Sequence, residues 1–138
     1  MRHHIKGVIM RANGFYKMED EMFAFECNTF IELDEHKLEI VIKKIARHYG
    51  FKFTGLRKSR RMKCYACTYH DYTIRFSTRY KLRLLTLIHE CAHLMYKKRY
   101  GYHCSFLHDK RLLSCVKKIV KYVKRNKSIQ ELLGVKYV

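Results

Sequence analysis

Two histidines and a glutamate of this chain have residue types and a spacing that suit them to bind a metal and to catalyse a reaction. His89, Glu90 and His93 form an H-E-x-x-H motif. It lies in a stretch with apolar residues at helical spacing, namely Leu84, Leu85, Ile88, Ala92 and Met95. Residues four apart on a helix lie on one face, so the two imidazoles could hold one Zn²⁺ at roughly 2.0–2.1 Å. Glu90 could act on a water molecule as a base, and the motif is therefore typical of a zinc hydrolase, most often a protease.

A catalytic zinc usually takes three protein ligands and leaves a fourth position open. Two histidines follow the motif, His103 and His108, and Asp109 is a further candidate. The residue types and spacing leave all three open as the third ligand.

The segment His108-Asp109-Lys110-Arg111-Leu112 resembles part of the SprT-like zincin metalloproteases, which include the Spartan proteases of DNA–protein crosslink repair. In that family a third histidine follows the H-E-x-x-H helix after a loop and usually opens an H-G-x-x-F segment. Asp109 stands in place of the glycine and Leu112 in place of the aromatic residue. The resemblance implies that His108 completes the zinc site and that Glu90 is the catalytic base.

The resemblance continues upstream of the motif. The family has a small β-hairpin there, and this chain has Tyr65-Ala66-Cys67-Thr68 followed by Ile74-Arg75-Phe76-Ser77. Apolar and polar residues alternate over 72–77, as in a half-buried strand. The resemblance implies that this strand has an exposed edge, which holds an extended substrate by strand addition.

The elements needed to position these residues can be predicted from caps and periodicity. Asp34 and Gly50 are typical of the start and stop of a helix, and Asp109 of the start of a later one. The expected elements are a helix from 34 to about 48, a strand from 51, hairpin strands at 62–69 and 72–77, and helices at about 81–99, 109–125 and 128–133.

These elements predict an α+β fold. The resemblance makes it a minimal zincin-like domain, with an N-terminal helix, a small antiparallel sheet, the active-site helix and a C-terminal covering helix. We expect residues 34–138 to form this domain and residues 1–33 to form an N-terminal arm of short strands or irregular structure.

Charge is the second strong feature of the chain. Thirty Lys and Arg against twelve Asp and Glu give a net charge of +18, far more than solubility requires. Such an excess favours a polyanionic partner, because neutralising phosphates releases counterions. We expect single- or double-stranded DNA to contact the basic clusters, whose candidate residues are Arg57, Lys58, Arg60, Arg61, Lys117, Lys118, Lys121, Lys124 and Arg125.

Composition limits the remaining possibilities. A chain of 138 residues forms one ordinary domain, and it has no apolar run of about 20 residues that could span a membrane. No secretory signal is evident at the N-terminus, so we expect an intracellular monomer, in the cytoplasm or the nucleus, with its six cysteines reduced. The pair Cys64 and Cys67 has no second closely spaced pair, which favours packing of Cys67 over a structural zinc site.

The sequence thus predicts a zinc-dependent metalloprotease of the SprT-like type that acts on proteins bound or crosslinked to DNA. Three alternatives remain. One is a regulatory zinc peptidase of the ImmA/IrrE sort, with a different third ligand. Another is a basic nucleic-acid-binding module with a structural zinc. The third is a small toxin or viral factor that directs the same protease chemistry at a host protein.

Overall fold

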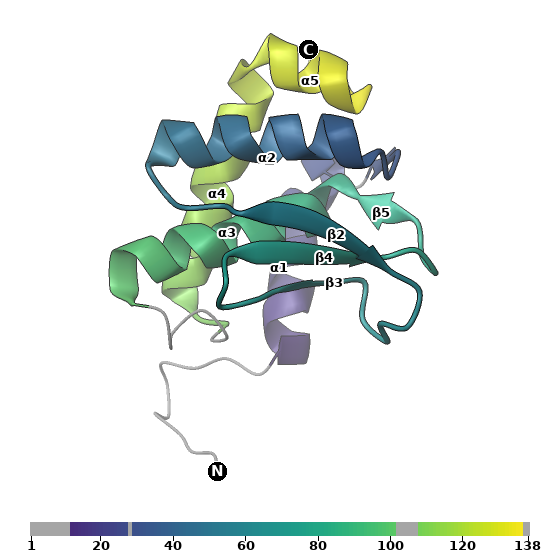
Figure 1. Ribbon diagram of the computed structural model, residues 1–138. Coiled ribbons are helices and arrows are strands. Elements are labelled where there is room, and N and C mark those ends of the chain that lie inside the picture. The colour runs from purple at the N-terminus through teal and green to yellow at the C-terminus, as the bar shows by residue number, and fades with distance from the viewer. Residues whose placement is uncertain (1–11, 28, 102–107, 137–138) are drawn as a thin grey trace.

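The computed structural model describes residues 12–27, 29–101 and 108–136, whose arrangement is shown in Figure 1. The elements, in chain order, are α1 (Ala12–Cys27), β1 (Phe30–Ile31), α2 (Glu35–Tyr49), β2 (Gly55–Ser59), β3 (Ala66–Thr68), β4 (Thr73–Ser77), β5 (Leu82–Arg83), α3 (Leu84–Tyr100), α4 (Lys110–Arg125) and α5 (Lys127–Leu133). This mixture of helices and small sheets confirms the α+β class. None of the described helices has the length and apolar character needed to cross a membrane.

The main sheet has three strands in the order β2-β4-β3. Strands β3 and β4 form the predicted antiparallel hairpin, whereas β2 pairs with β4 in parallel. The sheet is therefore mixed, and the prediction of an antiparallel sheet is wrong for β2. The prediction that the 72–77 strand has an exposed edge is also wrong, because β4 is central. Alternation marks a strand but not its neighbours, and four of the five residues of β4 are buried, on both faces, as expected of a central strand.

Helix α3 runs through the centre of the molecule. It packs against α4, α2, α1 and the strands β3 and β5, and in Figure 1 it passes behind the sheet. The sequence predicts an apolar stripe on this helix, yet Leu87, Leu94 and Tyr96 are buried as well. A helix that is surrounded on most sides buries residues all round, so α3 gives the H-E-x-x-H motif a rigid, buried support.

The flanking helices are amphipathic and capped as predicted. The Asp34 side chain accepts a hydrogen bond from the Lys37 backbone N–H at the start of α2 (3.1 Å), and Gly50 ends it at φ +74°, a conformation that favours glycine. Helices α2 and α4 each bury one apolar face against the core. The strand expected from residue 51 begins only at Gly55.

The prediction of strands or an irregular arm is wrong for residues 12–27, which form helix α1. Phe15, Glu19 and Phe23 recur every four residues and make its buried face. Helix α1 packs on α3, as the purple helix in Figure 1 shows. The first eleven residues lie outside the described part of the chain.

Candidate metal centre and active site

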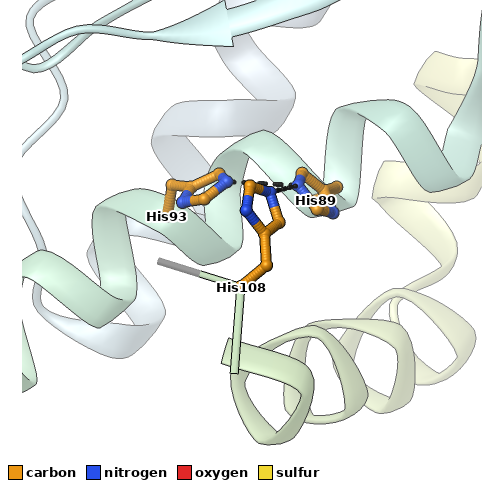
Figure 2. A group of neighbouring side chains, drawn as sticks. All are labelled: His89, His93 and His108. Atoms are coloured by element: carbon orange, nitrogen blue, oxygen red, sulfur yellow. Dashed lines mark hydrogen bonds between the residues drawn. The ribbon is translucent and has the colours of Figure 1, made fainter. Parts of the chain in front are cut away.

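The structure brings His89, His93 and His108 together, as the resemblance implies (Figure 2). Nε2 of His89 lies 3.1 Å from Nε2 of His93 and 3.3 Å from Nε2 of His108. Ligands at roughly 2.0–2.1 Å around a tetrahedral ion would be about 3.3–3.4 Å apart. These two separations, and a span of at most 4.8 Å among the three ligand atoms, are compatible with a metal ion held between them.

A buried carboxylate sets the protonation of His89. Oε2 of Glu19, on α1, lies 2.7 Å from Nδ1 of His89, and both side chains are 3% exposed. The proton of a neutral His89 therefore resides on Nδ1, which donates to Glu19, and Nε2 presents a lone pair to the centre. A carboxylate behind a histidine ligand is the usual arrangement at metal sites. This donor set also fits a metal.

The same contact affects the titration of His89. Burial alone would lower the pKa of this histidine, but the hydrogen bond to Glu19 and the negative charges of Glu90 and Glu19 raise it above its usual value. In the protein without metal, His89 therefore takes up a proton at a higher pH than an exposed histidine, and that proton competes with a metal ion.

The position of His108 is fixed by the residue that follows it. Asp109 caps α4 by accepting from the Leu112 backbone N–H (3.0 Å), and its other oxygen accepts from the Tyr96 hydroxyl of α3 (2.7 Å). These bonds tie the start of α4 to α3 next to His93. Because both oxygens of the Asp109 carboxylate accept these hydrogen bonds, Asp109 acts as a cap and not as the third ligand. Its φ of −127° suits any residue, and glycine is not required there.

His103, the other candidate for the third ligand, lies outside the described residues. Within those residues the histidine group is the one cluster of three or more side chains suited to hold a metal. Cys64 is exposed and Cys67 half-buried, and neither belongs to such a cluster. Cys91 lies inside the motif, where burial raises the pKa of its thiol and keeps it unreactive.

Glu90 lies beside the histidines but is held differently. Its Oε1 accepts a hydrogen bond from the Thr68 hydroxyl on β3 at 2.7 Å. Burial raises the pKa of the Glu90 carboxyl, while the charge of His89 and the Thr68 hydrogen bond offset part of that effect. A buried carboxylate with a raised pKa is suited to accept and return a proton near neutral pH.

Two hollows border these side chains. One, of about 490 Å³, is lined on the His89 side by residues of α1, α3 and the β3 region. The other, of about 110 Å³, lies against His93 and His108. Glu90 lines both hollows, so its side chain adjoins each of the two spaces that a bound molecule could enter.

Sequence reasoning missed two site residues on α1, Glu19 and Tyr16. The Tyr16 hydroxyl lies 3.4 Å from Nε2 of His108. Burial, followed by the charges of Glu90 and Glu19, raises the pKa of Tyr16 to about 12. A signal for Glu19 was present, because a glutamate between Phe15 and Phe23 at four-residue spacing puts a carboxylate on an apolar helix face.

The basic candidates lie on two separate elements. Arg57 and Lys58 are exposed on β2, followed by exposed Arg60 and Arg61. The exposed side of α4, opposite its buried face, carries the other five: Lys117, Lys118, Lys121, Lys124 and Arg125. None of these residues belongs to the histidine centre.

Searches with protein-family models, against curated proteins and against solved structures found no match for this chain. The functional argument therefore depends on the site itself.

Proposed function

We propose that this chain is a zinc metallopeptidase of the SprT-like type, with a minimal zincin-like arrangement of helix, sheet, active-site helix and covering helix. The observation that carries the proposal is the convergence of three histidine nitrogens beside the buried Glu90 carboxylate. His89, His93 and His108 hold the ion and Glu90 serves as the base. His108 as third ligand supports this type over an ImmA/IrrE-like peptidase, which has a different one.

Solvent access to the site supports catalysis over a purely structural zinc. Structural zinc sites are closed by four protein ligands, whereas catalytic sites have three and an open position. The described residues provide a group of three, with His108 half-buried and a hollow against His93 and His108. A module that used zinc only for folding would not require this access or Glu90.

The chain's own residues account for the proton transfers of peptide hydrolysis. When bound, zinc supplies a Lewis acid that polarises the substrate carbonyl and makes a water molecule more acidic. Glu90 takes a proton from the attacking water and delivers it to the leaving amine. Thr68 holds Oε1 of Glu90, which leaves Oε2 for that exchange. Glu19 keeps the His89 proton on Nδ1.

The outer edge of β3 is the site we propose for the substrate backbone. With the order β2-β4-β3, this strand is at the margin of the sheet, it packs on α3, and Ala66 borders both hollows. An extended peptide can pair with such an edge and bring its carbonyl to the histidines. Strand β3 thus takes the role that the sequence assigned to the 72–77 strand.

The test of the peptidase is Glu90→Gln, with Glu39→Gln as the control, because Glu39 pairs with Lys43 on the surface of α2. We expect Glu90→Gln to retain stoichiometric zinc and to lower kcat about 10²–10⁴-fold, while Glu39→Gln remains active. The substrates are a casein-type unfolded protein and a protein crosslinked to an oligonucleotide. Full activity of Glu90→Gln would exclude Glu90 as the base.

We further propose that the basic face of α4, defined by Lys117, Lys118, Lys121, Lys124 and Arg125, contacts DNA and so brings DNA-bound proteins to the site. Replacement of these five residues by Gln should weaken DNA binding. It should also lower the slope of log affinity against log salt by about 0.9 for each duplex phosphate that the protein no longer neutralises. The Gln variant of the four basic residues of the β2 cluster is the comparison. An unchanged slope in the α4 variant would contradict the proposal, and a lower slope in the β2 variant alone would assign the contact to the β2 cluster.

A further inference from the structure

A tyrosine of α1 lines both hollows that border the histidine group. The Tyr16 hydroxyl lies 3.4 Å from Nε2 of His108, the same atom that points to the metal centre. The ring centroid of Tyr16 is 5.1 Å from that of His89 and 5.3 Å from that of His108. An O–H group at this place is within reach of any molecule that enters the fourth position.

The position of Tyr16 is not explained by the packing of α1. Its side chain is 43% exposed, whereas Phe15, Glu19 and Phe23 are at most 5% exposed and hold the helix against the core. The packing of α1 therefore does not require the Tyr16 hydroxyl. We attribute the position of this hydroxyl next to the histidines to a role in the site.

The two hollows of the site share three residues: Tyr16, Ala66 and Glu90. A peptide that occupies both hollows therefore passes the Tyr16 and Glu90 side chains and Ala66 of the β3 edge. The scissile bond then lies near a proton acceptor from α3, Glu90, and a proton donor from α1, Tyr16.

We propose that Tyr16 is a catalytic residue whose hydroxyl donates a hydrogen bond to the carbonyl oxygen of the scissile peptide as negative charge develops there. This inference rests on the proposed peptidase function and adds to it a group supplied by α1. A preorganised donor stabilises the transition state more than the ground state, and loss of one such donor costs about 10²–10³ in kcat.

The step balances without any further reactant. The water oxygen forms a bond to the carbonyl carbon, the π electron pair moves to the carbonyl oxygen, and Glu90 takes the water's proton. When the pair returns to carbon, the C–N bond breaks and the nitrogen receives the proton from Glu90. Tyr16 donates its hydrogen bond to the carbonyl oxygen while that oxygen is charged and keeps its own proton.

Tyr16→Phe tests the hydroxyl alone, because the ring and its contacts remain. The control is Tyr100→Phe at the end of α3, since Tyr100 is 40% exposed and packs on Tyr96 away from the hollows. Both variants of the full chain are compared with the unmodified protein for zinc content, for kcat and KM, and for acetohydroxamate affinity of the cobalt-substituted form, followed by its visible absorption.

We expect Tyr16→Phe to keep its zinc, to lose about 10²–10³ in kcat with little change in KM, and to bind acetohydroxamate about tenfold more weakly. The Tyr100→Phe protein should match the unmodified one. Loss of zinc from Tyr16→Phe, or an unchanged kcat, would overturn the inference.

The hydroxamate measurement separates this inference from the proposed function. If the unmodified protein cleaves no peptide, the peptidase proposal fails, and the hydroxamate affinity still decides whether Tyr16 donates to an oxygen at the site. A tenfold loss in Tyr16→Phe supports the donor, and equal affinities overturn it.

Discussion

Helices α1 and α3 both reach the histidine group, but they contribute to it in different ways. Helix α3 supplies His89, Glu90 and His93 from five consecutive residues and is buried on nearly all sides. Helix α1 supplies Glu19, seventy residues earlier in the chain, and over residues 14–23 it buries one face. The difference teaches that two of the three clustered imidazoles are placed by spacing within one buried helix, whereas the carboxylate that holds one of them comes from a peripheral helix. The two contributions should therefore be separable by mutation.

The largest effect should come from the ligands themselves. We expect His93→Ala and His108→Ala to lose stoichiometric zinc, because two imidazoles cannot replace a three-ligand site. The exposed His36 of α2 gives a matched control, His36→Ala, which should keep its zinc. Elemental analysis of the purified proteins measures the outcome. Zinc retained by His108→Ala would assign the third ligand to a residue outside those described.

Removal of the α1 carboxylate should weaken metal binding without abolishing it. We expect Glu19→Ala to bind zinc about 10–100-fold more weakly, the usual cost of losing the partner of a histidine ligand. Asp20→Asn is the control, since the adjacent Asp20 pairs with Arg83 at the surface (3.2 Å) and does not touch a histidine. Competition with a chelating dye gives both dissociation constants. An effect of Glu19→Ala equal to that of His93→Ala would remove the distinction between the two helices.

The pH dependence of zinc binding should differ between the unmodified protein and Glu19→Gln. Glu19 raises the pKa of His89, so protons compete with zinc at a higher pH and affinity falls as pH falls through that pKa. In Glu19→Gln that charge is gone and only Glu90 still opposes the effect of burial, so the pKa of His89 falls relative to the unmodified protein. Compared with the unmodified protein, Glu19→Gln should bind zinc more weakly at high pH. Its affinity should begin to decline only at a lower pH. If the zinc affinities of the two proteins declined over the same pH range, this account would be contradicted.

The smallest effect should come from the contact between β3 and Glu90. Thr68→Val removes the hydroxyl that donates to Glu90 with little change of shape. Because this hydrogen bond lowers the pKa of Glu90, its loss should move the acidic limb of kcat/KM to higher pH and lower activity a few-fold near neutrality. Thr78→Val, at an exposed position, is the control. An acidic limb that does not move would show that Thr68 has no part in the titration.

The elements that the sequence predicts well are those with local signals. Asp34, Gly50 and Asp109 are capping residues whose capping hydrogen bonds involve neighbours within four residues, and His89 and His93 are joined by helical spacing alone. The β3–β4 hairpin is similarly local. Each of these features could be read from a short segment, because the interaction that forms it lies within that segment.

What the sequence does not predict depends on contacts between distant segments. The neighbour of β4 across the sheet is β2, and the parallel pairing of the two cannot be read from the alternation in either strand. Glu19 and Tyr16 become site residues only because α1 packs on α3. The apolar spacing of Phe15 and Phe23 indicates a helix, but nothing in it indicates which histidine the glutamate between them will contact.

The bond between Tyr96 and Asp109 also bears on what keeps the histidine group assembled. Asp109 joins His108 to α3 from the downstream side, through the start of α4. A change that separates α4 from α3 would therefore carry His108 away from His89 and His93. The cluster thus depends on the packing of two helices as well as on the helical spacing of the motif.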